Sequence, residues 1–525
     1  MNVHRLAAGV LLPGFIGLTP PRWLLAAIED GLAGVVYFAP NIGSPAQLTE
    51  LSARLHGLRD DLLVAADEEG GDVTRLRSAT GSHLPGNAAL GAVDDEAITE
   101  AVAGAIGREL RLVGVDLNLA PCVDVNCDPA NPVIGVRSFG SSASLVARHG
   151  AAYVRGLQAA GVAACAKHYP GHGDTRIDSH LGVPVVPASA DTLRARELPP
   201  FAAAVAAGAL AVLTAHVRYP ALDPSQPATL SHTVLGMLRT EFGFDGVIVT
   251  DALDMHAISR TLGVAGGAVA SLAAGADLLC LGNPDNGGTP AGGAADHYGV
   301  GVGSGSSSGV GSGPGSGSAS DGRGDGEAEL RLVWDAVVAA VESGELPLAR
   351  LEEAYSRVQA LAAWTAAARA TPLPPASRPD FGRQVASRAI EVTGRVSLAS
   401  RPELVDLRRH INHAAGRSST ALTEELDRRA PAGAGTGMVV LVDEPQRDAA
   451  VQAELRALLA SRPDAVVVAT GWPDPSIDLG RNVVRTFGNA RANAEAAAEV
   501  LFGSASLPAP SPLSSPSPLS PLEDS

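Results

Sequence analysis

The segment VAACAKHYPGHGDTRIDSH, residues 162–180, joins a short apolar run to a loop crowded with polar side chains. A short, continuous apolar run next to a loop is typical of a parallel strand that is buried on both faces. The residues from Lys167 onward include three histidines and two aspartates. The same order, an apolar run and then polar side chains, recurs through residues 1–282, and this recurrence predicts the fold.

Eight apolar runs occur in this part of the chain, and stretches with helical periodicity, such as residues 145–161, lie between them. The runs are LAAGVLLPG (6–14), GVVYFA (34–39), LLVAA (62–66), VDLNLA (115–120), VAACA (162–166), AVLTA (211–215), GVIVT (246–250) and DLLCL (277–281). A strand followed by a helix, repeated eight times, indicates an α/β fold with a (β/α)8 TIM-type barrel. We interpret LAAGVLLPG as the first strand.

The eighth helix of this barrel comes late in the chain. A Gly/Ser-rich insertion at about residues 290–326 precedes it, and we predict that this insertion is disordered because it has few apolar side chains to bury. The helical pattern resumes at Glu327, and prolines end the barrel domain, residues 1–371. Residues 380–503 predict a smaller α/β sandwich-like domain, and residues 504–525 a disordered Pro/Ser tail.

The composition excludes several classes of partner. Lysine and arginine number 39 against 56 acidic residues, a net charge of −17, which disfavours binding to nucleic acids or to anionic membrane surfaces. The four cysteines have no paired spacing and predict reduced thiols. We expect a cytoplasmic protein, because the N-terminal run lacks a charged start and a small-residue cleavage site. The oligomeric state stays open.

Polar residues follow five of the predicted strands. In a TIM-type barrel the carboxyl ends of the strands meet at one mouth, where the chemistry of such enzymes takes place. One aspartate at a strand end is more often a turn former or helix cap than a catalyst, but five successive strand ends predict a shared polar pocket. The residues are Asp67, Asp124, Lys167 with His168, His216 and Asp251.

Asp251 is the strongest candidate for a nucleophile. It follows the apolar residues VIVT directly, so its carboxylate is expected to be rigid and partly desolvated, which suits attack on a carbon such as the anomeric carbon of a sugar. Asp178 and His180 lie two residues apart, and in an extended backbone their side chains would face the same way. The carboxylate would then orient an imidazole that transfers protons near neutral pH.

A metal site is the alternative interpretation of the same loop. His168, His172, Asp174, Asp178 and His180 are all plausible ligands, although no HExxH or similar tight signature is present. A metal-dependent barrel hydrolase therefore remains an alternative. A sugar-binding protein without catalysis is another, and the presence of Asp251 together with the Asp178/His180 pair disfavours it.

Five segments together resemble glycoside hydrolase family 3, in its bacterial β-N-acetylglucosaminidase branch. They are DEEGGDVTRL (67–76), LAPCVDV (119–125), NPVIGVRSFG (131–140), KHYPGHGDTRIDSH (167–180) and VIVTDALDM (247–255). The resemblance implies a retaining exo-β-N-acetylhexosaminidase that acts on β-linked N-acetylglucosamine saccharides without a cofactor. It also points to a role in recycling cell-wall muropeptides, with chitooligosaccharides or glycoconjugates that end in N-acetylglucosamine as alternative substrates.

The resemblance assigns roles residue by residue. Asp251 matches the nucleophile that forms a covalent glycosyl-enzyme, and His180 matches the acid/base, with Asp178 as its partner. The residues that match the sugar-binding positions are Asp67, Arg137, Lys167 and His168, and those that fall in motif segments near the same site are Asp124 and His216. One departure is Asp72, where the family commonly has arginine; Arg75 is the nearby residue that would compensate.

Two alternatives stay within this family. An imidazole that has lost its proton is neutral, whereas a carboxylate is an anion, so a histidine acid/base would repel an incoming phosphate less. Phosphorolysis of the same glycosides is therefore an alternative to hydrolysis. Activity on other β-glycosides is the second alternative, although those branches take their acid/base from elsewhere. The smaller domain is accordingly expected to be structural.

Overall fold

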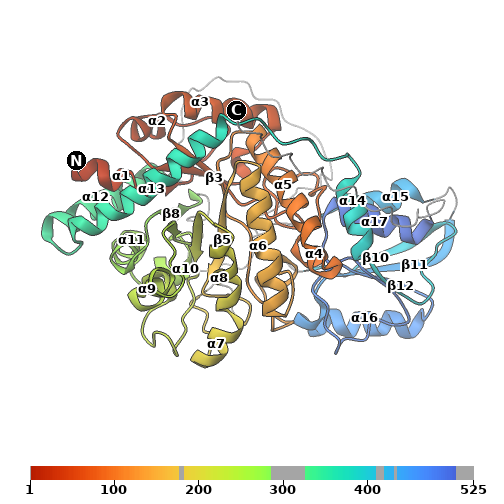
Figure 1. The fold of residues 1–525 in the computed structure, drawn as a ribbon. Helices are drawn as coiled ribbons and strands as arrows, with labels where there is room; N and C mark the ends of the chain where they lie inside the picture. Colours follow the sequence, from red (N-terminus) through yellow and green to blue (C-terminus); the bar gives the residue numbers. More distant parts are fainter. Residues whose placement is uncertain (1, 177–181, 285–325, 410–418, 431–433, 504–525) are drawn as a thin grey trace, which may run out of the picture.

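The computed structural model describes residues 2–176, 182–284, 326–409, 419–430 and 434–503, which form a large barrel domain and a smaller domain beside it (Figure 1). Nearly all of the predicted Gly/Ser-rich insertion lies outside the described residues, and so does the whole predicted Pro/Ser tail. Among the helices that the structure describes, none has the length and apolar character that a transmembrane span requires.

All strand pairs of the barrel are parallel. Its strands are β1 (Leu11–Pro13), β2 (Gly34–Tyr37), β3 (Leu63–Ala66), β4 (Leu117–Asn118), β5 (Ala163–Tyr169), β6 (Ala211–Thr214), β7 (Val247–Val249) and β8 (Leu279–Gly282). Strands β2 to β7 pair in sequence order, β1 pairs with β8, and a bridge between Val249 and Leu278 links β7 to the β8 segment. The predicted TIM-type barrel is confirmed, and its carboxyl ends form one mouth.

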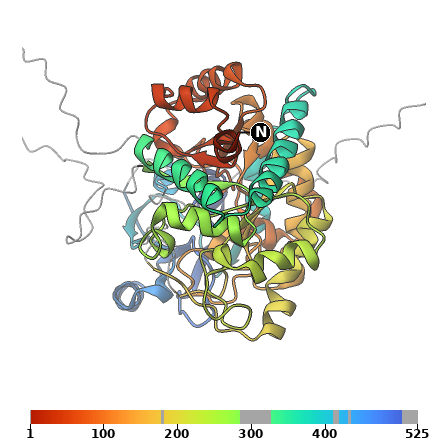
Figure 2. The same ribbon diagram turned by 90° about the vertical axis from the view of Figure 1, so that its left-hand side faces the viewer.

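Helices surround these strands (Figure 2). They include α2 (Arg22–Glu29), α3 (Pro45–Leu58), α5 (Glu96–Leu112), α6 (Ala143–Ala159), α8 (Leu198–Ala206), α9 (His232–Thr240), α11 (Gly263–Ala274), α12 (Glu327–Ser343) and α13 (Leu348–Arg369), with the short helices α4 (Asn87–Val93), α7 (Ala190–Arg196) and α10 (His256–Ser259). One face of each strand packs inside the barrel, as Leu63 and Leu213 do, and the other packs against helices, as Val64 and Val212 do. Burial on both faces explains why the strands are continuously apolar.

The prediction for the first strand was wrong at its amino-terminal end. Residues 6–8 of the apolar run belong to helix α1 (Val3–Ala8), and β1 begins only at Leu11. The Asn2 side chain accepts a hydrogen bond from the His4 N–H and caps this helix, while Leu6 packs into the core. A short apolar run is compatible with either a buried helical turn or a strand. Here the Asn2 side chain caps a helix, so the first residues of the run are helical.

The smaller domain is a three-layer α/β/α sandwich. Its sheet has the order β10 (Arg401–Asp406), β11 (Ala434–Val442), β12 (Val466–Ala469), β13 (Asn482–Arg485) and β9 (Glu391–Thr393), with only β9 antiparallel. Helices α15 (Ala421–Arg429) and α17 (Arg491–Phe502) pack on one face, and α16 (Ala449–Ser461) packs on the other. Because β10 to β13 are parallel, their carboxyl ends share one edge of the sheet.

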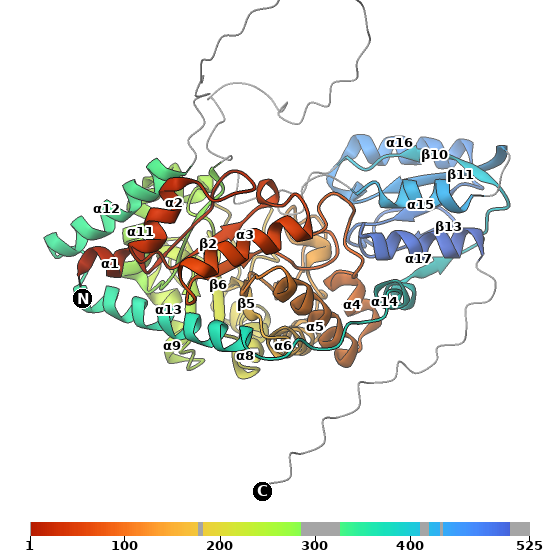
Figure 3. The same cartoon turned by 90° about the horizontal axis from the view of Figure 1, so that it is seen from above.

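That edge faces the barrel. Helix α14 (Phe381–Ala389) lies beside α4 of the barrel, as Figure 3 shows. Phe487, which follows β13, packs against Ala88 and Ala89 of α4 and against Val136. The Asp72 carboxylate accepts hydrogen bonds from the backbone N–H of Asn489 at 2.6 Å and from its side-chain amide at 3.4 Å. Asp72, the departure noted above, therefore joins the two domains.

Candidate active site at the barrel mouth

A chain of alternating charges lies at the carboxyl ends of β3, β4 and β5. The Lys167 ammonium lies 2.7 Å from both Asp67 Oδ1 and Glu69 Oε1. The Arg137 guanidinium holds Glu69 with two hydrogen bonds, of 3.0 and 2.7 Å. Arg75 Nη2 lies 3.6 Å from Asp67 Oδ2 on the outer side of the cluster. Three of the predicted sugar-binding residues, Asp67, Arg137 and Lys167, are thus brought together.

The electrostatics keep this cluster ionised. Burial alone would raise the pKa of Glu69, but Arg137 and Lys167 outweigh it and hold the pKa well below its usual range. Burial would likewise lower the pKa of Lys167, and the Asp67 and Glu69 carboxylates raise it instead. Two anions and two cations with fixed geometry present both acceptors and donors, which is what a polyhydroxy ligand needs.

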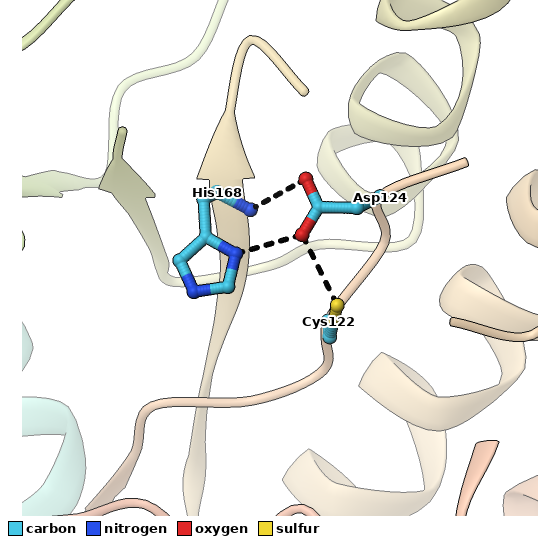
Figure 4. A group of neighbouring side chains, drawn as sticks. All are labelled: Cys122, Asp124 and His168. Atoms are coloured by element: carbon cyan, nitrogen blue, oxygen red, sulfur yellow. Dashed lines mark hydrogen bonds and ion pairs between the residues drawn. The ribbon is translucent and has the colours of Figure 1, made fainter. Parts of the chain in front are cut away.

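His168 belongs to a second chain, with Asp124 and Cys122 (Figure 4). Its Nδ1 lies 2.7 Å from Asp124 Oδ2, to which the Cys122 S–H also donates at 3.1 Å. Asp124 Oδ1 accepts the backbone N–H groups of His168 and His172 at 3.2 and 2.7 Å. A carboxylate opposite Nδ1 fixes the ring and leaves Nε2 facing Arg137 Nη2 at 3.4 Å. The two chains therefore meet at Arg137.

The pKa of Asp124 lies well below its usual range. Burial would raise it, but the charge and hydrogen bond of His168 and the nearby His172 lower it more. Asp124 is also completely buried. Its contacts are those of a group that orients His168, and a direct contact with sugar stays a prediction.

The structure offers a different set of possible metal ligands from the set proposed from the sequence. Among the described residues, Cys122, Asp124 and His168 are the one group of three whose ligand atoms lie within 4.8 Å of one another. Of the ligands proposed from sequence, His172 Nδ1 instead hydrogen-bonds Thr175 Oγ1 at 2.7 Å, and Asp174 pairs with Arg196 at 2.7 Å. We interpret the Cys122 group as a hydrogen-bonded chain, because the Cys122 thiol and His168 Nδ1 each already hydrogen-bond Asp124 Oδ2.

Asp251 follows β7 at the same mouth. Its side chain is partly exposed, and Oδ1 accepts the Ala252 N–H at 2.9 Å. His216 is completely buried beneath this segment, with Nε2 3.0 Å from the Ala252 carbonyl oxygen and Nδ1 2.8 Å from Thr229 Oγ1. His216 therefore supports the backbone that carries Asp251, and a contact between His216 and sugar stays a prediction.

Asp67 and Asp251 share neighbours across the mouth. Burial raises the pKa of the Cys165 thiol on β5 and of the Cys280 thiol on β8, and both carboxylates raise each of them further. Burial and His168 lower the pKa of His172 to about 4, while Asp251 acts in the opposite direction. Asp251 therefore acts electrostatically on Cys165 and Cys280, as Asp67 does, and on His172 of the β5 loop.

Asp178 and His180 lie outside the described residues. The part of their loop that is described, up to Arg176, is held by Asp124, Asn131 and Tyr219: Asn131 Nδ2 donates to the His172 carbonyl at 2.9 Å, and the Tyr219 hydroxyl donates to the Gly171 carbonyl. The acid/base assignment stays a prediction.

Sequence reasoning missed Glu69 and Cys122. Glu69 lies in the quoted DEEGG motif, but it is three residues past the strand end, and its partners Arg137 and Lys167 are 68 and 98 residues away. Cys122 lies in LAPCVDV and would have been found by asking which donor satisfies Asp124. Both residues could have been found by asking which groups pair with the buried charges at the strand ends, because a buried charge requires a partner.

Comparisons with known proteins agree on one family. Residues 25–287 match the model of the glycosyl hydrolase family 3 N terminal domain. A beta-hexosaminidase of Xylella fastidiosa is 40% identical over 264 residues, which cover 49% of this chain and 78% of that protein. Beta-hexosaminidase A of Pseudoalteromonas piscicida is 38% identical over 284 residues, 50% of this chain and 48% of that relative, so the match spans about half of its length.

The structure is similar to solved structures of two bacterial proteins. A glycoside hydrolase family 3 beta-N-acetylglucosaminidase from a Paenibacillus species superimposes with a TM-score of 0.80 and 32% identity, covering 96% of this chain and 97% of that one. A beta-N-acetylhexosaminidase from Beutenbergia cavernae matches 69% of this chain with a TM-score of 0.56 and 26% identity. The first similarity extends over both domains.

Proposed function

The chain belongs to glycosyl hydrolase family 3 and is a glycoside hydrolase, and from the geometry of its mouth we propose that it is a retaining, exo-acting β-N-acetylhexosaminidase that releases terminal N-acetylglucosamine. The observation that supports this most directly is that Asp251 follows β7, while the cluster of Asp67, Lys167, Glu69 and Arg137 lies at the carboxyl ends of β3 and β5 in the same barrel. A fixed carboxylate facing a set of sugar-hydroxyl partners is what covalent glycoside cleavage requires.

In the proposed mechanism Asp251 attacks the anomeric carbon. The bond between this carbon and the leaving oxygen breaks, and His180, oriented by Asp178, donates a proton to that oxygen. The sugar is then held as an ester of Asp251. His180 next removes a proton from water, which attacks the same carbon and releases Asp251, so two inversions give net retention.

The hydroxyl and N-acetyl groups of the sugar would be held by Asp67, Arg137, Lys167 and His168. Asp67 and Lys167 pair with each other at 2.7 Å, so each is already oriented before the sugar arrives. Preorganised charged partners cost little reorganisation when positive charge develops on the sugar ring. Glycosides that lack the N-acetyl group would make fewer of these contacts.

Two measurements test the proposal. Incubation with 4-nitrophenyl N-acetyl-β-glucosaminide, followed by proton NMR, should show the β-anomer of N-acetylglucosamine as the first product; an α-anomer would show inversion and overturn the mechanism. A 2-fluoro or slow-turnover glycoside should label Asp251, as located by mass spectrometry. Labelling of any other carboxylate would overturn the nucleophile assignment.

The alternatives are tested on the same preparation. Added phosphate should leave free N-acetylglucosamine as the main product if hydrolysis is the reaction, whereas sugar 1-phosphate would indicate a phosphorylase. Matched aryl glucosides and xylosides should be poorer substrates than the N-acetylglucosaminide. Loss of activity to a chelator, with recovery on adding zinc, would favour the metal-dependent hydrolase.

A cytoplasmic location and a role in recycling cell-wall muropeptides are further proposals, which rest on the resemblance. Cell fractionation tests the first. The second predicts that deletion of the gene causes muropeptides with terminal N-acetylglucosamine to accumulate in cell extracts, and unchanged levels would contradict it.

A further inference from the structure

A small cavity lies at the boundary of the two domains, beside the ion pair of Glu69 and Arg137. Its volume is about 10 Å³, which leaves room for at most about one water molecule. Barrel residues form most of its wall, and among the described residues Phe487 is the one from the smaller domain that lines it. The proposed mechanism gives Phe487 no role, although its side chain lies next to two members of the charged cluster at the mouth.

Phe487 reaches the cavity from the turn that follows β13. Its backbone has a φ of +56°, in the left-handed region that favours glycine and is unfavourable for a bulky side chain. The barrel holds this turn in place, because Asn489 donates its backbone N–H to Asp72 Oδ1 at 2.6 Å. Residues kept in unfavourable backbone conformations cluster at functional sites. The conformation of Phe487 is therefore explained if its ring has a function in the barrel.

The ring packs against the two segments that hold the backbone of Arg137. One segment is helix α4, whose first residue, Asn87, donates its side-chain N–H to the Arg137 carbonyl at 2.7 Å. The other is a turn of 3-10 helix, in which Val136 contacts the ring and Arg137 is the next residue of the chain. Phe487 therefore supports the position of Arg137 through both segments.

The same ring keeps water away from the ion pair. The side chains of Glu69 and Arg137 are only 3% and 4% exposed. The cavity beside them is also lined by Asn87, whose Oδ1 is buried and has no hydrogen-bond partner within the described part of the chain. Without the ring, water that enters this space would hydrogen-bond Asn87 and compete for the Arg137 guanidinium. An ion pair that water reaches is weaker and less fixed in its geometry.

A displacement of Arg137 would spread through the charged cluster. The Arg137 guanidinium holds both oxygens of Glu69, and Glu69 Oε1 in turn lies 2.7 Å from the Lys167 ammonium. A polyhydroxy ligand needs donors and acceptors in fixed positions, so loosening one member of the cluster weakens several contacts. We propose that Phe487 is a positioning residue for Arg137, through which the smaller domain fixes the sugar-binding cluster at the barrel mouth.

This inference rests on the proposed function, because the contact between Arg137 and the sugar is part of that proposal. It gives the smaller domain a part in substrate binding, beyond the structural role expected from the sequence. It also predicts which kinetic constant changes. Arg137 would contact the sugar both before and during the reaction, so loosening Arg137 should raise KM and leave kcat nearly unchanged.

Substitutions at Phe487 in the full chain separate the role of the ring from that of the backbone. Phe487→Ala removes the ring and keeps the unfavourable backbone conformation, whereas Phe487→Gly removes the ring and relieves that conformation. Phe487→Leu keeps an apolar side chain in part of the same space. Arg491→Ala is the matched control: Arg491 Nε donates to the Thr80 carbonyl at 2.8 Å and so also joins the domains, but Arg491 is not among the residues that line the cavity.

The measurements are kcat and KM on 4-nitrophenyl N-acetyl-β-glucosaminide, with a thermal melt of each variant. Phe487→Ala and Phe487→Gly should both raise KM about tenfold with kcat within about twofold of the wild type, although Phe487→Gly should be the more stable of the two. Phe487→Leu should recover most of the loss, and Arg491→Ala should leave KM as in the wild type. In an Arg137→Lys background, Phe487→Ala should raise KM no further, because the side chain that the ring positions is already changed.

Three results would each overturn the inference: an unchanged KM in the variants that lack the ring, a KM that follows the melting temperature across all variants including Arg491→Ala, or the same increase in KM in the Arg137→Lys background. The second result is expected if the ring only packs the domains together. Phe487→Gly keeps the test decisive if Phe487→Ala does not fold. The proposed function fails in a different way, because the wild type would then not hydrolyse the aryl N-acetylglucosaminide, and the role of Phe487 in sugar binding would fail with it.

Discussion

The two ends of the barrel both bury carboxylates beside cations, yet they differ in what else each carboxylate contacts. At the mouth, Asp67 pairs with Lys167 but keeps 18% of its side chain exposed. At the opposite end, Asp277 is completely buried, with Arg239 Nη2 and Arg350 Nη2 each at 2.5 Å from one of its oxygens. A buried ion pair therefore does not by itself indicate a functional site. What distinguishes Asp67 from Asp277 is that solvent can reach the Asp67 carboxylate.

At the end of the barrel opposite the mouth, which we call the closed end, ion pairs and hydrogen bonds connect helices to strands. Asp277 also accepts the backbone N–H of Ile248 at 2.9 Å, so β7, α9 and α13 meet at one carboxylate. Asp116 repeats the arrangement, with Arg369 Nη1 at 2.5 Å and His56 Nε2 at 2.8 Å. In barrels of this type the end opposite the mouth is where stability is built. Substitutions at the two ends should consequently separate catalysis from stability.

The largest effect is expected at the mouth. Asp251→Asn removes the proposed nucleophile, so kcat on the aryl N-acetylglucosaminide should fall at least about a thousandfold. The melting temperature should stay close to that of the wild type, because Asp251 is partly exposed and its replacement has the same size. Steady-state kinetics and thermal melts check both points. Normal turnover of an aryl glycoside with a good leaving group would exclude Asp251 as the nucleophile.

The opposite pattern is expected at the closed end. Asp277→Asn leaves Arg239 and Arg350 without their buried anion, which should cost about 3–5 kcal/mol in the free energy of unfolding. The kcat of the protein that remains folded should be within about twofold of the wild type, because the substitution is remote from the mouth. Urea titration and active-site titration measure the two quantities. A selective loss of kcat with unchanged stability would contradict the division between the ends.

A smaller effect, dependent on pH, is expected at Glu197, which lies behind the β5 loop. One of its oxygens accepts from Arg196 Nε at 2.7 Å, and within the described part of the chain Oε2 has no hydrogen-bond partner. Burial raises the pKa of Glu197 from 4.5 to about 7. The folded protein therefore holds this proton more tightly than the unfolded chain does, and the stability that results is lost as pH rises from about 4.5 to 7.

Glu197→Gln removes this titration. Between pH 5 and 8 the free energy of unfolding of the wild type should fall more than that of the variant, by a difference of about 2–3 kcal/mol. Urea denaturation of both proteins at each pH gives this difference directly. Parallel pH dependence in the two proteins would show that Glu197 has an ordinary pKa in the fold.

The contrast between the two ends also explains what the sequence could predict. The strands were visible because burial on both faces makes them continuously apolar, and the mouth was visible because polar residues follow those strands at once. The closed end was not visible, because Asp277 and Arg350 are 73 residues apart and Asp116 and Arg369 are 253 apart. Likewise, nothing near Asp72 in the sequence points to Asn489, 417 residues later. Such pairs depend on the packing of helices and domains, which local patterns do not encode.

The smallest effect concerns the support of His168 at the mouth. The Cys122 S–H donates to Asp124, which in turn fixes the His168 ring. Cys122→Ala removes this donor and should cost about 1 kcal/mol of transition-state stabilisation, a roughly fivefold loss in kcat/KM. Cys122→Ser keeps a donor and should recover most of that loss. If alanine and serine variants are equally impaired, the thiol acts through packing, and the hydrogen bond to Asp124 contributes nothing that kinetics can detect.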